Sequence, residues 1–255
     1  MKSKLFTILL LFAILPLAAQ RIQMDGIASL EQVYGEQVES ESLLPMNDLD
    51  VEFGYILYEA EIDIEAEDAL LEVENVRDYA AVYANHALQG VVTDNRKKIT
   101  LPASPGKYTL RLYVENIGRI TYGPEILDNS KGMFGNIYLD GEPIENWKIT
   151  ALNVRDCNVS NLTFANEKAS DLPAFHRGMF EIDTPGDTYL DISGWGMGEV
   201  WINNQYMGSY WEEEKQQSIQ VPAAVLKKGQ NTIVVFEMKN NRQETMLLSD
   251  HPVFK

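Results

Sequence analysis

The chain has 255 residues and is acidic, since 38 Asp and Glu residues against 21 Lys and Arg residues give a formal net charge of −17. A negative surface repels nucleic acid and anionic membrane, so the charge argues against both and favours a neutral partner such as a glycan. The length would accommodate a (β/α)8 barrel, but the amphipathic helices that such a barrel needs between its strands are missing. One cysteine, Cys157, excludes an internal disulfide, so the fold must depend on its hydrophobic core.

The N-terminal residues 1–20 have the pattern of a secretory signal peptide. Lys2 and Lys4 precede an apolar run over residues 5–17, and small residues follow it. The run is too short and wrongly flanked for a stable membrane span. We therefore expect no membrane span, a mature chain that is periplasmic or secreted, and a linker over residues 21–47.

Short runs of alternating apolar and polar residues follow, separated by turns rich in Gly, Pro, Asn and Asp. This pattern is typical of antiparallel β-sandwiches. Helix is expected only in short pieces, such as residues 223–228 before Gly229. The clearest predicted strands cover residues 56–64, 81–84, 109–115, 136–139, 189–192 and 232–238.

Residues 191–211 predict a β-hairpin beside a glycine-rich bend. Two segments rich in strand-forming residues, 200–202 and 206–211, flank Asn203-Asn204-Gln205. Asn tolerates the left-handed backbone that a tight hairpin turn requires. Upstream, three alternating glycines surround Trp195, which indicates backbone that bulges or passes close to another surface.

The two halves of the chain repeat one another. Val82-Tyr83-Ala84-Asn85 corresponds to Val200-Trp201-Ile202-Asn203 at an offset of 118 residues. Two further matches share an offset of 120, which is hard to explain by the general similarity of β-sheets. The repeat predicts two tandem jelly rolls. They cover residues 48–153 and 172–255, with a linker at residues 154–171.

Several motifs resemble the C-terminal jelly-roll, galactose-binding-like region of family-35 β-galactosidases. In the first roll these are residues 53–58, 76–85, 114–123 and Lys131-Gly132; in the second, Gly194-Trp195-Gly196, residues 200–203, Gly208, Tyr210-Trp211, Gln216-Gln217, Val221-Pro222 and residues 226–237. The resemblance departs at Asn204, where the family has Gly, and at Ser209, where it has Arg. It implies an all-β chain of two galactose-binding-like rolls. The family's catalytic barrel, which carries both catalytic glutamates, has no counterpart in this sequence.

Catalytic residues are not expected within the chain. A retaining glycosidase needs two carboxyl groups about 5–5.5 Å apart. The candidates are the run Glu212-Glu213-Glu214 or Asp191 with Glu199, and the acidic run is better explained as a solvated loop. The three histidines do not fall in a metal-ligand spacing such as HExxH.

Sugar binding requires aromatic faces for the C–H surface of a pyranose and polar groups for its hydroxyls. The predicted ligand-binding residues belong to the hairpin region and to one loop of the first roll, which in the resembled enzymes lies near the barrel. Trp201 is instead predicted to be core, and a structural ion pair remains an alternative for the arginine of the first roll. The candidates are Trp195, Trp211, Tyr210, Asn203, Arg119 and Tyr122.

A structural calcium ion is a further possibility, since Asp183, Asp187 and Asp191 are spaced oxygen ligands, although solvated carboxylates are favoured. No other cofactor is expected. The resemblance implies a secreted, non-catalytic accessory protein that binds β-galactoside-type glycans or a glycoside hydrolase catalytic subunit. The alternatives are a component of a β-galactosidase that is active only with a barrel supplied in trans, and a purely structural module.

Overall fold

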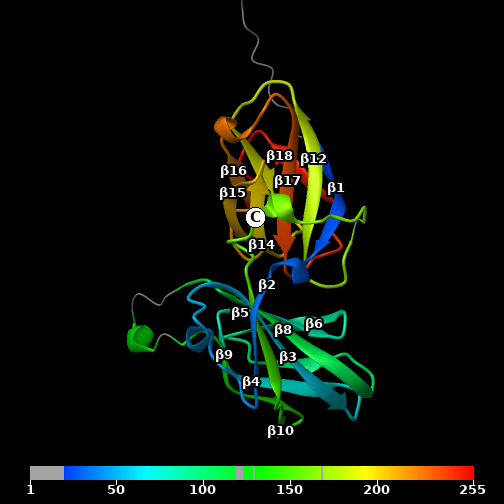
Figure 1. The fold of residues 1–255 in the computed structure, drawn as a ribbon, viewed down its shortest axis with the longest axis vertical. Helices are drawn as coiled ribbons and strands as arrows, with labels where there is room; N and C mark the ends of the chain where they lie inside the picture. The colour runs from blue at the N-terminus through cyan, green and yellow to red at the C-terminus, as the bar shows by residue number, and fades with distance from the viewer. Residues whose placement is uncertain (1–19, 119–122, 129, 168) are drawn as a thin grey trace, which may run out of the picture.

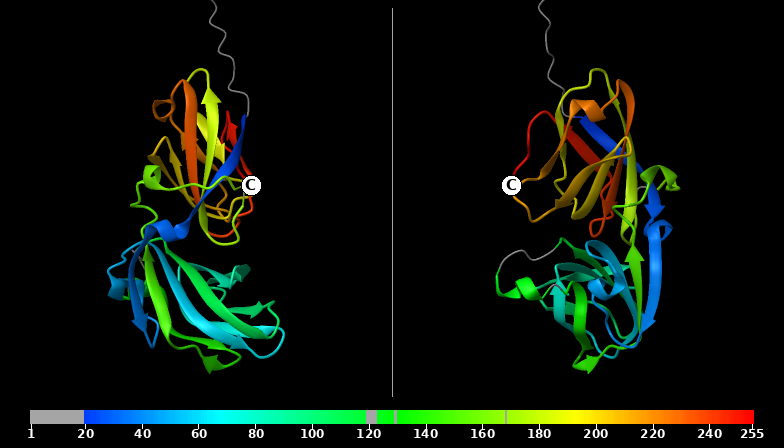
Figure 2. Two further views of the ribbon diagram at one scale, coloured as in Figure 1. Left: turned by 45° about the vertical axis from the view of Figure 1, so that its right-hand side comes forward. Right: turned by 60° about the vertical axis from the view of Figure 1, so that its left-hand side comes forward.

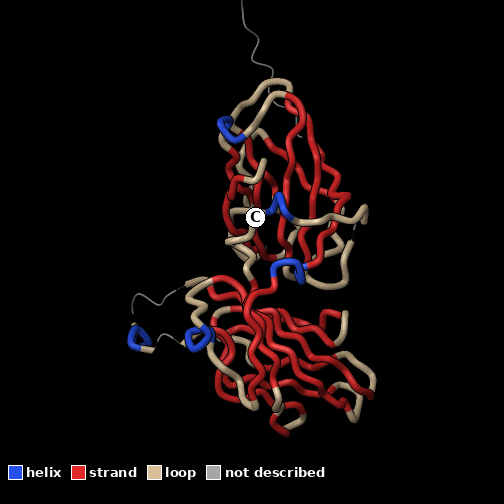
Figure 3. Tube along the Cα trace, viewed as in Figure 1, coloured by secondary structure: helices blue, strands red, loops and turns tan. Residues whose placement is uncertain are grey.

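A computed structural model describes residues 20–118, 123–128, 130–167 and 169–255. Within these ranges the chain forms eighteen strands, and its only helices are turns of three or four residues. Figure 1 shows two β-sheet bodies arranged along the long axis, and Figure 3 shows how strands dominate both. The all-β prediction is confirmed. The same ranges hold no helix long and apolar enough to cross a membrane.

The lower body in Figure 1 is the first roll. Its described strands form a six-stranded sheet in the order β2-β11-β3-β8-β5-β6 and a four-stranded sheet in the order β10-β9-β4-β7, with antiparallel pairing throughout. The strands are β2 (Tyr34–Ser40), β3 (Gly54–Ile64), β4 (Ala69–Arg77), β5 (Tyr79–Ala84), β6 (Ala87–Thr93), β7 (Lys98–Leu101), β8 (Gly106–Asn116), β9 (Gly132–Leu139), β10 (Glu142–Pro143) and β11 (Trp147–Leu152). Two 3-10 turns, η2 (Met46–Leu49) and η3 (Pro124–Leu127), lie in its connections.

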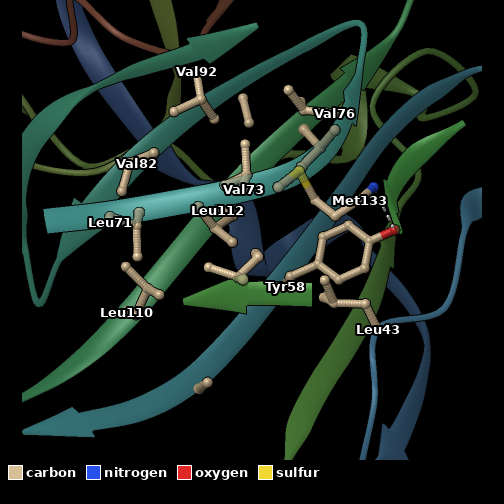
Figure 4. Packing of buried hydrophobic residues seen from close by; sticks show 14 of the residues in the cluster. Leu43, Tyr58, Leu71, Val73, Val76, Val82, Val92, Leu110, Leu112 and Met133 are labelled. Atoms are coloured by element: carbon tan, nitrogen blue, oxygen red, sulfur yellow. Dashed lines mark hydrogen bonds between the residues drawn. The ribbon is translucent and has the colours of Figure 1, made fainter. Parts of the chain in front are cut away.

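The core of the first roll lies between these two sheets. Figure 4 shows Leu71 and Val73 of β4 among Val82 of β5 and Leu112 of β8, all of them buried. Alternate residues of each strand point inward because successive side chains of a strand face opposite sides of the sheet. Tyr58 brings a hydroxyl into this core, where it donates to the Leu44 carbonyl at 2.8 Å and accepts from the Met133 amide at 3.3 Å.

The second roll is built from one sheet that folds over on itself. Among the described residues its strands run in the order β15-β14-β17-β12-β1-β18-β13-β16. Residues 20–23 of β1 pair with β18, and residues 24–29 pair with β12, with a register shift between Met24 and Gly26. A bulge of this kind bends a strand, which lets β1 pass from one layer to the other. The strands are β1 (Gln20–Ser29), β12 (Ala174–Ile182), β13 (Thr188–Asp191), β14 (Met197–Ile202), β15 (Gln205–Trp211), β16 (Ser218–Val221), β17 (Gly229–Glu237) and β18 (Thr245–Ser249).

The internal repeat corresponds to a repeated strand arrangement. The order β3-β8-β5-β6 of the first roll recurs as β12-β17-β14-β15 in the second. Both hairpins turn at an Asn with positive φ, 52° at Asn85 and 50° at Asn203. Each Asn also accepts a backbone N–H of the adjacent strand through its side chain, from Thr109 at 3.0 Å and from Thr232 at 3.1 Å. The two tandem rolls predicted from the offset are confirmed.

The prediction of a linker over residues 21–47 is wrong. This segment contains most of β1, all of β2 and a 3-10 turn, η1 (Leu30–Val33), between them. Within it, β2 joins the six-stranded sheet of the first roll, whereas β1 completes the sheet of the second roll; Figure 2 shows this blue segment passing from the upper body to the lower. The physical reason is burial: Ile22 and Met24 alternate with exposed residues and fill the core of the second roll.

The two rolls share a third hydrophobic core between them. The outer face of β3, β8 and β5 contributes Tyr55 and Tyr83, and the second roll contributes Phe175, Trp201 and Phe236. Ring centroids of Tyr55 and Phe236 are 5.1 Å apart, edge to face. Trp201 is 3% exposed, as predicted for a core residue. An interface made of fully buried aromatic residues opposes hinge motion between the rolls.

Candidate ligand-binding site

A cleft of about 520 Å³ opens between β15 and β16. These strands are the two edges of the eight-stranded sheet in the described chain, and they face each other across the cleft. In Figure 1 their labels lie together on one side of the upper body. The second roll supplies most of the wall and the first roll supplies Glu115 and Ile117. We call this the Trp211 cleft; polar groups that line it include Ser209, Trp211, Glu214, Gln216 and Gln220.

Trp211 ends β15 and lies half-buried where the two rolls meet. It pairs in register with Met197 of β14, and its indole contacts the ring of Tyr79 edge to face at 6.3 Å. The indole Nε1 is buried and has no hydrogen-bond partner among the described residues. Trp211 therefore lines the cleft with a partly exposed aromatic side chain, while its N–H is a buried donor without a partner among the described residues.

Glu115 reaches the same cleft from β8 of the first roll and is 1% exposed. Its Oε1 accepts from the Tyr55 hydroxyl at 3.1 Å, while its Oε2 has no partner in the described parts of the chain. Burial, and next the negative charge of Glu199, raise the pKa of the Glu115 carboxyl to about 8. Desolvation disfavours the charged form, so this carboxyl is mostly protonated at neutral pH.

Glu199 of β14 ties the two rolls together. Its Oε1 accepts from Arg155 Nε at 2.6 Å and from the Tyr55 hydroxyl at 2.9 Å, and its Oε2 accepts from Tyr206 at 2.7 Å. Arg155 Nη2 also lies 3.6 Å from Glu115 Oε1. The Arg155 guanidinium and the Tyr55 hydroxyl thus each bridge the two carboxyl groups, Glu115 and Glu199, inside the interface. In this arrangement Glu199 is held by structural partners rather than presented to a substrate.

The structure separates the predicted ligand-binding residues. Trp195 is 1% exposed in the core of the second roll, where its Nε1 donates to the Thr245 carbonyl at 3.1 Å. Its ring therefore has no face open to a ligand. Tyr210 lines the Trp211 cleft, but it is 6% exposed and its hydroxyl donates to Glu237 Oε2 at 2.9 Å.

Asn203 is occupied by the hairpin turn. Its Nδ2 donates to the Val225 carbonyl at 2.9 Å and to Asn231 Oδ1 at 2.7 Å, and its Oδ1 accepts from Thr232. Arg119 and Tyr122 lie outside the described residues. Of the candidates in the second roll, Trp211 is thus the aromatic residue that lines the cleft and is partly exposed.

Two domain families match successive parts of the chain. Residues 44–153 match the first all-beta domain of beta-galactosidase, and residues 173–231 match its galactose-binding domain. Through these domains the chain belongs to the β-galactosidase family. The first matched range covers most of the first roll, and the second covers part of the second roll.

Curated members of this family are similar to most of the chain. Human beta-galactosidase-1-like protein 2 is 36% identical over 216 residues, which cover 80% of this chain and 33% of that protein. Beta-galactosidase 17 of Arabidopsis thaliana is 33% identical over 235 residues, covering 79% and 34%. The dog beta-galactosidase is 34% identical over 227 residues, covering 78% and 34%. The chain spans about a third of the length of these β-galactosidases.

Likeness to solved structures is slight. The apo lectin of Pleurotus ostreatus aligns over 93% of this chain and 83% of its own, with a TM-score of 0.27 and 11% identity. We draw no functional conclusion from that alignment.

The cleft also contains Glu115, a residue that the sequence did not predict to be part of a site. Glu115 was absent from the predicted site because it lies in an apolar strand, and a lone acid there carries no pattern of a site. Its signals are its place in the resembled motif of residues 114–123 and the carboxylate with which β8 interrupts a buried run, since such a carboxylate requires a partner or a raised pKa. Arg155, in the predicted linker, supplies part of that compensation.

The predicted calcium ligands lie around the second roll. Asp187 Oδ1 accepts from the Ala223 amide at 2.8 Å, and Asp191 Oδ1 accepts from the Ser193 amide at 2.8 Å. Asp183 is exposed. Within the described ranges, no group of three or more Asp, Glu, His or Cys side chains is arranged to hold a metal ion.

Proposed function

We propose that this chain is an exported, non-catalytic accessory module that binds β-galactoside-type glycans in the Trp211 cleft. The observation that carries the proposal is the partly exposed side chain of Trp211, which lines the cleft together with polar side chains such as Ser209 and Gln216. An indole face packs against the C–H surface of a pyranose, and amides and hydroxyls satisfy sugar hydroxyl groups. The strongly negative charge of the chain favours such a neutral ligand over an anionic one.

The interface carboxylates support a role without catalysis. Glu199 is completely buried and bound by Arg155, Tyr55 and Tyr206. A glycosidase nucleophile must instead face the sugar, with an acid/base partner at a set distance. Glu115 is likewise buried and bonded to Tyr55.

Isothermal titration with methyl β-galactoside tests the proposal. Trp211→Ala removes the ring and is expected to abolish measurable binding, while Tyr189→Ala, a half-buried aromatic on β13, serves as the matched control. Equal affinities of wild type and Trp211→Ala contradict the proposed site. Purified protein is also expected to leave an aryl β-galactoside uncleaved, and turnover by the chain alone contradicts the non-catalytic role.

A second function, docking to a separate catalytic barrel, is favoured by exposed apolar side chains on the first roll. Phe53 is 54% exposed, Ile117 55% and Leu127 95%. A docking function predicts that β-galactosidase activity appears on mixing with a barrel polypeptide. It also predicts that Leu127→Glu lowers that activity, whereas Met179→Glu, an equally polar change at an exposed apolar residue of the second roll, leaves it unchanged.

Export is proposed from the N-terminal pattern of Lys2, Lys4 and the apolar run that follows. N-terminal sequencing of protein expressed in a host with a secretory pathway tests it. Cleavage close to Gln20 supports export, and an intact Met1 opposes it.

A further inference from the structure

The Trp211 cleft adjoins a second cleft of about 350 Å³, which we call the Phe53 cleft. Phe53 and Arg155 line the Phe53 cleft, and Ile117 lines the Trp211 cleft. Phe53 directly precedes Gly54, and Ile117 directly follows Asn116; Gly54 and Asn116 pair at the end of the β3–β8 ladder. The two clefts therefore adjoin at this end of the ladder, where Phe53 is 54% and Ile117 55% exposed.

Tyr206, at the start of β15, connects the two clefts from the side of the second roll. Trp211 pairs with Met197 of β14, and Tyr206 pairs with Trp201, with a register shift that accommodates one extra residue of β15. Met197 and Trp201 both belong to the core between the rolls, so Trp211 and Tyr206 lie on the sheet face that is turned to the first roll. The four-residue step along β14 separates them by about 13 Å.

The exposed rings of Tyr206 and Phe53 are held by one buried ion pair. The Tyr206 hydroxyl donates to Glu199 Oε2 at 2.7 Å, and Arg155 Nε donates to Glu199 Oε1 at 2.6 Å. The Arg155 guanidinium carbon in turn lies 5.7 Å from the centre of the Phe53 ring. Tyr206 is 47% exposed. Each roll thus presents an anchored aromatic side chain at this end, and a ligand that binds there has little side-chain motion to restrict.

The charges around the Phe53 cleft favour a neutral ligand. Arg155 is already neutralised by Glu199, and the exposed carboxylates of Asp50, Glu52 and Asp156 line the cleft. A negative surface of this kind repels anions. Aromatic rings offer faces to the C–H surface of a sugar, which carries no charge.

From this arrangement we infer that the Trp211 cleft is one end of an extended oligosaccharide site, and that Tyr206 and Phe53 form its other end. The inference rests on the proposed glycan-binding function and adds the length of the ligand. A single pyranose at Trp211 is too short to reach Tyr206 about 13 Å away along the sheet. A linear chain of several units spans both ends and contacts both rolls.

The dependence of affinity on chain length tests the inference. Isothermal titration of the wild-type protein compares methyl β-galactoside with a linear β-linked galactotetraose. The tetraose is expected to bind at least about tenfold more tightly, which exceeds the statistical gain from its repeated units.

Substitutions at the Tyr206 end locate the additional contacts. Phe53→Ala and Tyr206→Ala are each expected to weaken binding of the tetraose about threefold to tenfold and to leave the affinity for methyl β-galactoside within about twofold of the wild type. Tyr206→Phe keeps the ring and should bind the tetraose within about twofold of the wild type. Tyr138→Ala, a half-buried tyrosine on β9 of the other sheet, is the matched control and should change neither affinity. Near-UV circular dichroism of each variant checks that the interface between the rolls is intact.

The outcomes separate the inference from the function on which it rests. If the tetraose binds no more tightly than methyl β-galactoside, or if Phe53→Ala and Tyr206→Ala bind it as the wild type does, the extended site is overturned and glycan binding in the Trp211 cleft stands. If Phe53→Ala instead lowers only the activity of a mixture with a barrel polypeptide, the surface docks a protein and the extended site is again overturned. If the wild-type protein binds neither sugar, both proposals fail.

Discussion

Glu115→Gln is expected to change how the stability of the protein depends on pH. The Glu115 carboxyl is 1% exposed between the two rolls, and its pKa is raised from 4.5 to about 8. Burial is the main cause, followed by the charge of Glu199; the Tyr55 hydrogen bond and the charge of Arg155 act in the opposite direction. Gln has a similar shape and cannot ionise, so it removes only the titration.

The sign follows from proton binding in the two states. Between pH 4.5 and about 8 the folded protein keeps a proton on Glu115 that the unfolded chain has lost, so the free energy of unfolding falls as pH rises through this window. A shift of this size corresponds to at most about 5 kcal/mol. Relative to wild type, Glu115→Gln should be nearly unchanged at pH 4.5 and more stable by several kcal/mol at pH 9.

Urea unfolding followed by tryptophan fluorescence at pH 5, 7 and 9 measures the difference. Comparison at each pH cancels the titration of other groups, including Glu237, whose pKa is also raised by burial. Glu36→Gln, an exposed carboxylate on β2, is the matched control and should leave the pH dependence unchanged. A stability difference between wild type and Glu115→Gln that does not vary with pH would refute the reasoning.

Two other substitutions test the packing that supports the cleft. Arg155→Ala leaves Glu199 buried without its cation and should lower the free energy of unfolding by about 3–5 kcal/mol in urea, whereas a loss below about 1 kcal/mol would show that the pair is dispensable. Gly198→Ala would place a Cβ 1.8 Å from the Phe236 carbonyl oxygen. It should destabilise the second roll by more than about 4 kcal/mol, seen as a large drop in the thermal midpoint. Gly186→Ala, with no heavy atom within 4 Å of its Cβ, should be nearly neutral, and a similar drop there would contradict the steric explanation.

Local patterns predicted the strands and turns of this chain well. The hairpin at Asn203-Asn204 was predictable because few residues besides Gly and Asn accept positive φ, and both residues adopt it, at 50° and 66°. Trp201 was predicted to be core from its alternating position and is buried. Such features depend only on residues near in sequence.

Residues 21–47 show where local reasoning failed. The alternation of Ile22 and Met24 is too short to stand out, and the strand they form pairs with partners more than 140 residues away, β12 and β18. The residues next to a strand in sequence do not indicate which distant strands it pairs with. The same limit applies to the cleft, since Trp195 and Trp211 both lie near glycines and only the fold makes Trp195 core and Trp211 a partly exposed residue of the cleft.

The sequence by itself determined the all-β class, the two-fold repeat, the turns and the kinship with β-galactosidases, because each of these depends on periodicity or on motifs contiguous in the chain. Only the tertiary structure decided that β1 belongs to the distant roll, that Glu115 and Glu199 meet Arg155 inside the interface, and that Trp211 borders an open cleft. Burial and hydrogen bonding between residues far apart in sequence arise from the packing of one sheet on another, and no single segment encodes them.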